Sequence, residues 1–368
     1  MSKIFTFLKK EIVLTVSFVL AIISMNFVTP NEKYFDYIDF RTLGLLFSLM
    51  TVMAGFNKMG VFKVIAEYLL NKVNTMRGVT LSLVLLCFFS SMIITNDVAL
   101  ITFVPFSVVL LKLANKQNRM IFVVTLETIA ANLGSMLTPI GNPQNLYLFS
   151  AYNMSISDFF YTIAPYAMLS LGLLVIFSLF SDKSKLANLG DREEVSFDKR
   201  FLTMYAVLFA IALLSVFRVL NYIVLLAVVI VFVLIFDRKV LLKVDYSLLF
   251  TFVFLFIFIG NLGNIAQINS WLSEIVGGNE VVVGVLASQV FSNVPAAILL
   301  SGFTCNAAAL MIGVNIGGLG TLIASMASLI SFKFIQKESV SIAKYLGVFT
   351  LLNVVFLAAN LALWVVVK

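Results

Sequence analysis

The sequence predicts an all-α polytopic membrane protein built from two inverted-topology repeats, and three observations support this fold class. Of the 368 residues, 61% are apolar and only 12% are charged, whereas soluble domains contain about 25% charged residues. Most Lys and Arg residues fall in loops that one topology places on the same side. The two halves of the chain also share a short alignment around their interrupted apolar segments.

The apolar runs predict nine membrane crossings, since a spanning helix takes about 20 residues. Two of these spans are broken, at 119–151 and 305–333. Two further apolar segments, 78–114 and 281–304, are expected to enter the membrane and return to the side they left. The continuous spans are expected at 11–30, 40–57, 157–181, 201–217, 219–236, 246–262 and 341–366.

The positive charges orient this map. In the nine-crossing topology, 21 of the 25 Lys and Arg residues lie on one side, which the positive-inside rule assigns to the cytoplasm. The N-terminus is therefore expected inside and the C-terminus outside, in the cytoplasmic membrane of a prokaryote. The net charge of +7 is then a topology signal and a contact with lipid headgroups, and no nucleic-acid partner is expected.

The segment 281–304 is predicted to be a re-entrant hairpin because its arms are too short to span. Val281–Phe291 and Pro295–Thr304 contain 11 and 10 residues, about 15 Å of helix each, which is roughly half the hydrocarbon thickness. Its tip, Ser292-Asn293-Val294-Pro295, would lie near the midplane. The arms of 78–114 are longer, and two full helices fit that segment equally well. The internal repeat favours a second hairpin there.

The repeat is strongest around the breaks. Asn132–Leu146 aligns without gaps to Asn315–Leu329, with five of fifteen positions identical. The hairpin tips carry matching hydroxyl-Asn pairs, Thr95-Asn96 and Ser292-Asn293. One extra span separates the halves and inverts the second, which is the pattern of secondary transporters. The predicted units are a first repeat at 1–181, a linker with the extra span at 182–218, and an inverted second repeat at 219–368.

The interrupted segments suit ion and solute binding. Each break frees carbonyls that can coordinate Na⁺ and amides that can hold an anion. Asn142 and Asn145 could instead simply cap the break. The neutral oxygen ligands near the tips and breaks suit a monovalent cation or a small polar solute. They are Thr95, Asn96, Asn132, Thr138, Ser292, Asn293, Asn315 and Thr321.

Two acids fall within apolar segments, Asp97 and Glu127. An acid at membrane depth is costly and is a functional candidate by default. Asp97, at a hairpin tip, could ligate Na⁺, carry a proton or neutralise a buried donor. Glu127 could pair with Arg119 or a cytoplasmic lysine, or face the translocation path. The chain has no histidine, so any proton carrier is limited to these two acids.

An enzyme is not expected. The absence of histidine excludes Ser-His and Cys-His nucleophile pairs, and Asp97 and Glu127 lack a protease-like surrounding motif. Phosphate-binding loops are also absent from the sequence. A passive channel is the other alternative class.

The motifs resemble those of the ion transporter superfamily, which includes arsenite permeases, sodium/proton antiporters and citrate-transporter-like permeases. Thr-Asn-Asp-Val-Ala-Leu at 95–100, followed by Val104-Pro105, is similar to the first hairpin signature. Ser292-Asn293-Val294-Pro295 resembles the second. Residues 312–325 resemble the second unwound helix of the arsenite-permease-like branch.

This resemblance implies an elevator transporter in which a scaffold domain forms a homodimer and a transport domain moves across the bilayer. Solute would sit between the two tips, with Na⁺ or H⁺ as the coupling ion and no other cofactor. The implied cation-binding residues are Thr95, Asn96, Asp97, Thr138, Gly141, Ser292, Asn293, Asn315 and Gly320. The implied solute-binding residues are Asn96, Asp97, Asn142, Pro143, Asn293, Val294, Thr321 and Ser325.

The sequence departs from the dicarboxylate branch, which carries Ser-Asn-Thr at both tips. Asp97 and Val294 replace the two threonines, and an aspartate beside a dianion would repel it. We therefore expect cation-coupled transport of a small anion or carboxylate. Metalloid efflux of the arsenite type and Na⁺/H⁺ antiport also fit.

Overall fold

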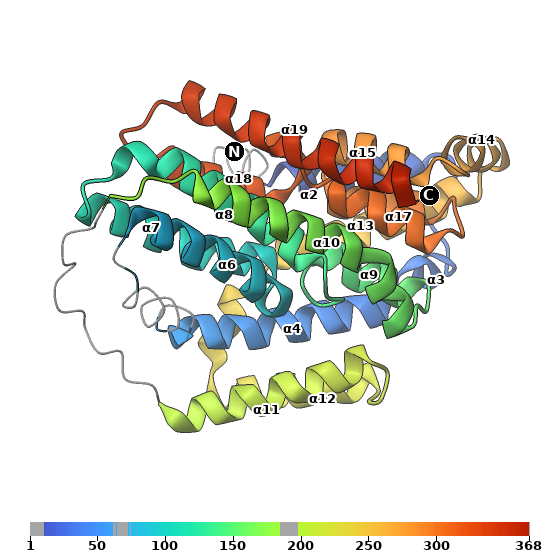
Figure 1. Cartoon of the computed structure of the whole chain (residues 1–368). Coiled ribbons are helices and arrows are strands. Elements are labelled where there is room, and N and C mark those ends of the chain that lie inside the picture. The colour runs from blue at the N-terminus through green and yellow to red at the C-terminus, as the bar shows by residue number, and fades with distance from the viewer. Residues whose placement is uncertain (1–10, 62–63, 65–72, 74, 185–197, 368) are drawn as a thin grey trace, which may run out of the picture.

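The computed structural model describes residues 11–61, 64, 73, 75–184 and 198–367 (Figure 1). All regular structure in this part of the chain is helical, which confirms the predicted all-α class. The first helices are α2 (Ile12–Met25), α3 (Tyr34–Tyr37), α4 (Phe40–Lys58), α6 (Met76–Ile94), α7 (Asn96–Leu113), η1 (Gln117–Arg119), α8 (Met120–Ser135), α9 (Pro143–Ala151) and α10 (Ile156–Leu179). They are followed by α11 (Lys199–Val216), α12 (Tyr222–Phe236), η2 (Arg238–Lys243), α13 (Tyr246–Gly263), α14 (Ala266–Val276), α15 (Glu280–Phe291), α16 (Asn293–Ser301), α17 (Ala307–Ile316), η3 (Leu322–Ala324), α18 (Met326–Ile335) and α19 (Ile342–Val367).

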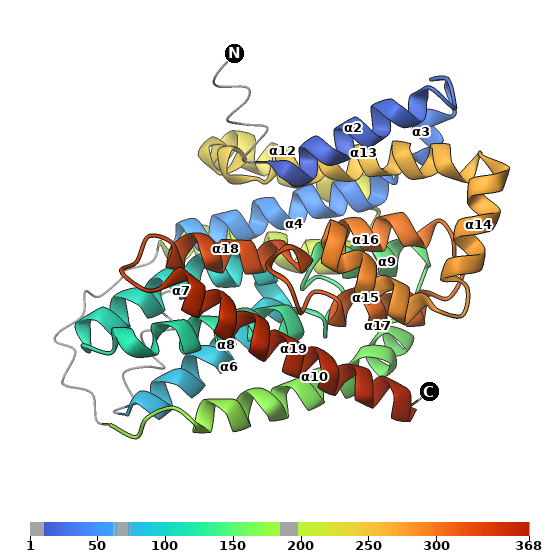
Figure 2. The same cartoon turned by 90° about the horizontal axis from the view of Figure 1, so that it is seen from above.

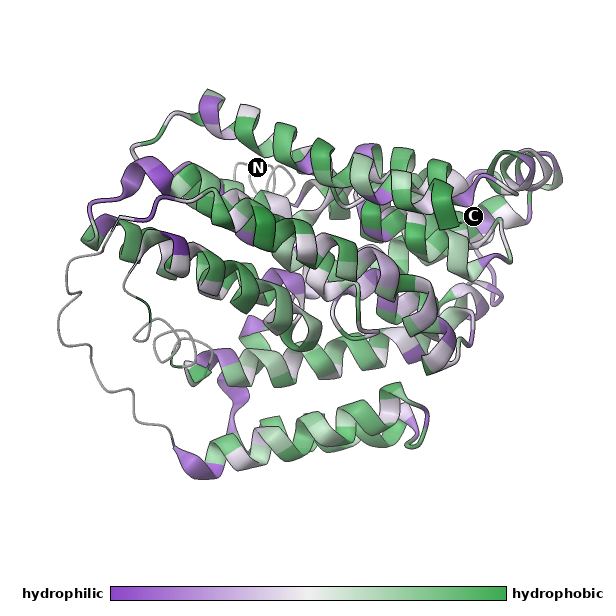
Figure 3. Ribbon diagram, viewed as in Figure 1, coloured by the Kyte–Doolittle hydropathy of each residue, from purple (hydrophilic) through white to green (hydrophobic). Residues whose placement is uncertain are grey.

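The chain is a multi-pass membrane protein. Within the described ranges, seven helices are long and apolar enough to cross a bilayer, or up to eight if the bent pair α14 and α15 forms one span. Large apolar side chains on α11 and α12 are exposed, among them Val207, Leu214, Ile223 and Val231. Both helices are coloured mostly as hydrophobic in Figure 3. Lipid tails are as apolar as these side chains, so this surface suits a bilayer.

The helices pack as two groups (Figures 1 and 2). In the first, which we call the α4 bundle, α13 packs on α2, and α11 and α12 pack on α4. The second, the hairpin bundle, consists of α6–α10 and α15–α19, with α8 packed against α6, α7, α10 and α19. The two bundles meet where α4 contacts α9 and where α13 contacts α16.

Side-chain caps fix where several spans begin. Asp39 precedes α4 and accepts a hydrogen bond from the Thr42 amide at 2.9 Å. Asp245 precedes α13 and accepts one from the Leu248 amide at 3.0 Å. Such caps satisfy amides that the first helical turn leaves unpaired. They place Asp245 directly at the junction between η2 and α13.

Both hairpins turn at a single residue. Thr95 separates α6 from α7, and Ser292 separates α15 from α16. The second turn is tighter than the four-residue tip expected at 292–295, because α16 already begins at Asn293. The arms of the first hairpin have 19 and 18 residues, and those of the second have 12 and 9. By length alone, only the first pair reaches the thickness of a bilayer.

Candidate functional site

The two hairpin tips share one unusual backbone conformation. Thr95 has φ 73° and ψ 153°, and Ser292 has φ 73° and ψ 154°. This region is sparsely populated by residues with a side chain and costs about 1–3 kcal/mol. The following residues, Asn96 and Asn293, are buried and begin the next helix. Strain retained at two equivalent positions is typical of a functional constraint.

The first break lies between the end of α8 and the start of α9, and asparagines fill it. Asn145 Nδ2 donates to the carbonyls of Met136 at 2.9 Å and Thr138 at 3.2 Å. Asn142 Oδ1 accepts from the Asn145 amide at 2.9 Å. The capping role considered for these two asparagines is therefore present. Thr138 also donates its hydroxyl to the Met92 carbonyl on α6.

Gly141 ties this break to the first hairpin tip. Its carbonyl accepts from the Asn96 amide at 3.1 Å. A Cβ at this position would lie 2.1 Å from the Ser135 carbonyl oxygen, so the turn requires glycine. The tip and the break consequently form one unit.

The second break, between α17 and α18, is filled differently. Gln289 on α15 donates Nε2 to the carbonyls of Gly317 at 2.8 Å and Leu319 at 2.9 Å. Its Oε1 accepts from the Thr321 amide at 2.9 Å. Gly320, at φ +108°, allows the chain to turn around this side chain. One glutamine therefore occupies the backbone groups that the break frees.

Side chains at aligned positions cross-link the two breaks. Asn142 Nδ2 donates to Asn315 Oδ1 at 3.2 Å, and Asn315 Nδ2 donates to Asn145 Oδ1 at 2.6 Å. In the counterpart contact, Ser325 Oγ donates to Asn132 Oδ1 at 3.0 Å. Asn132 Oδ1 also accepts from Asn96 Nδ2 at 3.2 Å. In the gap-free alignment Asn132 corresponds to Asn315, and Asn142 to Ser325, so equivalent residues make equivalent contacts.

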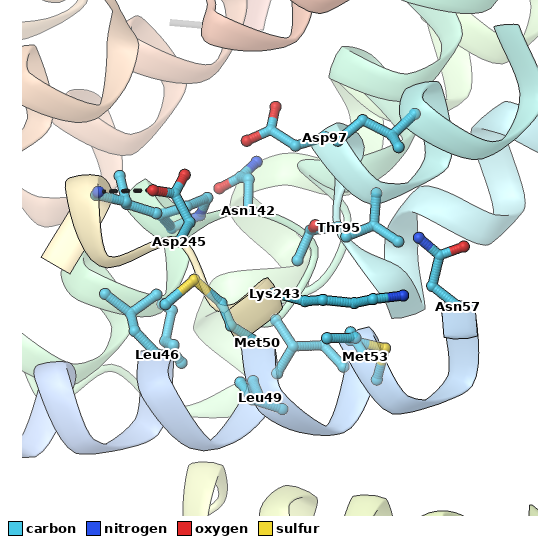
Figure 4. Close-up of a pocket in the computed structure, with 17 residues that line it drawn as sticks. Leu46, Leu49, Met50, Met53, Asn57, Thr95, Asp97, Asn142, Lys243 and Asp245 are labelled. Atoms are coloured by element: carbon cyan, nitrogen blue, oxygen red, sulfur yellow. Dashed lines mark hydrogen bonds between the residues drawn. The ribbon is translucent and has the colours of Figure 1, made fainter. Parts of the chain in front are cut away.

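A cavity of about 180 Å³ lies between the first tip and break and the α4 bundle. Its wall includes Thr95 and Asp97 from the tip, Asn142 and Pro143 from the break, and apolar side chains of α4. In Figure 4 the carboxylates of Asp97 and Asp245 lie on one side of the cavity with Asn142. The Asp97 Oδ1 atom is buried and has no hydrogen-bond partner among the described residues. An unpaired carboxylate oxygen in a cavity wall can bind a cation or a proton.

The structure brings only part of the predicted site to this cavity. Of the predicted cation- and solute-binding residues, Thr95, Asp97, Asn142 and Pro143 line it. Asn96, Thr138 and Gly141 lie behind them in the network of the first break. The predicted residues of the second half are outside its wall: Ser292, Asn293, Val294, Asn315, Gly320, Thr321 and Ser325.

Glu127 is also outside the cavity wall. Its side chain is fully buried on α8 and accepts a hydrogen bond from the Ser107 hydroxyl of α7. Neither Arg119 nor any lysine that the structure describes forms an ion pair with it. The Oε2 atom has no partner among the described residues.

Three polar residues of the cavity were not predicted from the sequence: Asn57, Lys243 and Asp245. Lys243 is one of the 21 basic residues that the nine-crossing topology places on one side, yet its side chain lines the cavity. The sequence feature that could have predicted this role is the position of Lys243 shortly before a span. A lysine with a long apolar stem can extend several ångströms from such a position.

The family model for the citrate transporter matches residues 4–309, which covers most of the chain. The chain belongs to the citrate transporter family. Relatives of this family member include an uncharacterized transporter of Methanocaldococcus jannaschii, 32% identical over 94% of this chain and 95% of that one. Inner membrane protein YbiR of Escherichia coli is 31% identical over 84% of each chain. Membership confirms the expectation of a transporter and not an enzyme.

A shorter similarity links this citrate transporter family member to the silicon efflux transporter LSI3 of Oryza sativa. The two are 30% identical over 161 residues, which is 43% of this chain and 32% of the other. The resemblance to the ion transporter superfamily stated above is confirmed by these relatives.

Proposed function

We propose that this transporter moves a small anion or carboxylate across the cytoplasmic membrane in a step coupled to Na⁺ or H⁺. The observation that carries the proposal is the unpaired Asp97 carboxylate oxygen in the wall of the cavity. Asp97 lies in the first turn of α7, where the helix N-terminus favours negative charge. It would bind the coupling ion, with Thr95 and Asn142 as polar neighbours.

The architecture supports an elevator mechanism. The matching tip conformations and the crossed contacts between aligned residues support two inverted repeats, at 1–181 and 219–368. The cavity lies at the boundary between the two bundles, where sliding of the hairpin bundle would change the exposed side. In this proposal the α4 bundle is the static scaffold, the protein is a homodimer, and nine crossings place the N-terminus inside.

The test is solute uptake into proteoliposomes driven by imposed Na⁺ or pH gradients. The wild type should accumulate a small carboxylate against its gradient, and Asp97→Asn should remove the dependence on the cation. Current that follows voltage without any cation gradient would instead identify a passive channel. Unaltered cation dependence in Asp97→Asn would exclude the proposed role of this residue.

Metalloid or oxyacid efflux is the second candidate. It is favoured by the similarity to the silicon efflux transporter over 43% of the chain. Export of silicic acid or arsenite from loaded vesicles, with no uptake of carboxylates, would select this candidate.

A further inference from the structure

Lys243 is the one basic residue among the described residues that line the cavity. It is the last residue of η2, the short helix that joins α12 to α13. It therefore belongs to the α4 bundle, whereas Asp97 and Thr95 belong to the hairpin bundle. In Figure 4 its side chain extends along α4, and its ammonium group points toward Asn57 and away from the two carboxylates.

Lys243 is an exposed residue, like Lys239 on the same helix, and its ammonium group is unpaired. No hydrogen bond or ion pair joins it to any of the residues that the structure describes. Some lysines have such partners: Lys58 contacts the Asp237 carboxylate at 2.7 Å, and Lys116 lies 3.7 Å from that of Asp182. Lys239, on the same η2 helix as Lys243, has none among the described residues. An unpaired ammonium over an apolar cavity floor offers a charge-assisted hydrogen bond to an incoming anion.

Two acids, Asp97 and Asp245, line the same cavity as the Lys243 ammonium group. Asp245 caps α13 through Oδ1, which accepts from the Leu248 amide at 3.0 Å, and its negative charge and second oxygen remain in the wall. Asp97 Oδ1 has no partner and lies on the side of the cavity away from the ammonium (Figure 4). The wall thus carries two carboxylates and one ammonium group, and an anion would have to bind at the ammonium end, away from both acids (Figure 4).

We propose that Lys243 is the residue that binds the negative charge of the solute, which makes the cavity selective for anions over neutral oxyacids. This assignment rests on the proposed function, since it takes the cavity as the solute site. Cation and anion would bind side by side in one small volume. A bound cation would reduce the repulsion between the wall carboxylates and the anion, and a bound anion would raise the affinity for the cation. The two affinities are then linked by the same factor in both directions.

The position of Lys243 on the α4 bundle also determines the side of the membrane from which it would contact the solute. Because Lys243 lies on the α4 bundle, it can contact solute only when the first hairpin tip faces η2. A solute carried away on the hairpin bundle would lose this contact. The lysine would therefore act on solute binding from one side of the membrane.

The experiment is a titration of the purified full-length protein with acetate, succinate, citrate and silicic acid. Binding is followed by the rise in Tm, because a ligand that binds the folded state stabilises it. The variants are Lys243→Gln and Lys243→Arg. Lys239→Gln is the matched control, since Lys239 lies on the same η2 helix, is exposed and is outside the cavity wall.

At least one carboxylate should stabilise the wild type, and silicic acid should not. Lys243→Gln should need about 10- to 100-fold more of that carboxylate for half saturation, the effect of removing a hydrogen bond to a charged group. Lys243→Arg should retain most of the affinity, and Lys239→Gln should match the wild type. Without ligand, all three variants should melt within a few degrees of the wild type.

Three outcomes would overturn the assignment. They are equal affinities in Lys243→Gln and the wild type, stabilisation by silicic acid alone, and no response of the wild type to any carboxylate. Binding that depends on Lys243, in a protein that shows no cation-driven uptake in vesicles, would leave the assignment standing and overturn only the proposed coupled transport.

Discussion

The two hairpin tips have the same backbone and different chemistry. Thr95 and Ser292 differ by one degree in ψ, and each is followed by a buried asparagine at the start of a helix. Two residues beyond the turn, the first tip carries Asp97 and the second carries Val294. Asp97 lines a cavity, whereas Val294 is only 5% exposed and packs in the core.

The two helix breaks beside the tips differ in a similar way: the first lines the cavity, and the second is filled by a side chain. The first break lies beside the cavity, to which Asn142 and Pro143 contribute. The second is filled by the Gln289 side chain, which holds two carbonyls and one amide. The two halves therefore keep the same backbone conformation at their tips, and only the first tip carries an ionisable side chain, Asp97, in a cavity wall.

The largest expected effect comes from a glycine that only the first break requires. Gly141→Ala would place a Cβ 2.1 Å from the Ser135 carbonyl oxygen. We expect a loss of about 3 kcal/mol or more of stability, at the upper end for overpacking of a tight site. The measurement is Tm in detergent, together with the yield of monodisperse protein.

The aligned residue of the second half is already Ala324, so Ala324→Gly is the control and should cost about 1 kcal/mol. Equal stability of Gly141→Ala and the wild type would show that the first break is looser than its contacts indicate.

A smaller effect is expected at the second break. Gln289→Leu removes the donor to the Gly317 and Leu319 carbonyls and the acceptor for the Thr321 amide. Each buried group left unsatisfied costs about 1–3 kcal/mol, and exposed Thr321 can turn to water. The two carbonyls alone would cost about 2–6 kcal/mol, and we expect the lower part of that range because Gln289 is only half-buried and water can reach its place. The cation dependence of uptake should not change. Loss of that dependence in a well-folded variant would place an ion site in the second half.

The smallest effect is expected at Glu127. Its carboxyl group is buried and accepts a hydrogen bond from Ser107, away from the cavity wall. Glu127→Gln keeps the shape and an acceptor for that bond, so stability should change by less than about 1 kcal/mol. Uptake driven by a pH gradient should be unchanged. A variant that folds but no longer responds to pH would instead make Glu127 the proton carrier.

Much of this comparison could be predicted from the sequence. Apolar run lengths located the helices, and the glycines and prolines near 134–143 located the first break. The gap-free alignment of Asn132–Leu146 with Asn315–Leu329 located the second break, but it did not predict that side chains of one break would contact the other. These features could be read because each is local, or repeats at a fixed register.

The asymmetry of the site could not be predicted. Gln289 lies 28 residues from Gly317 in the chain, and nothing local marks its amide as the group that fills the second break. Lys243 and Asp245 are charged residues beside a span, a pattern that usually indicates only the membrane boundary. Their arrival at the cavity depends on how α13 packs against α4, which is a tertiary contact.

In the proposed mechanism, the unpaired carboxylate of Asp97 at the first tip binds the coupling ion. The most direct measurement is Tm of the wild type, Asp97→Asn and Val294→Asn, with NaCl compared with choline chloride at equal ionic strength and over a range of pH. We predict that Na⁺ or pH shifts Tm of the wild type and of Val294→Asn alike, and that Asp97→Asn loses this response. A response that persists in Asp97→Asn, or is missing in the wild type, would contradict the claim.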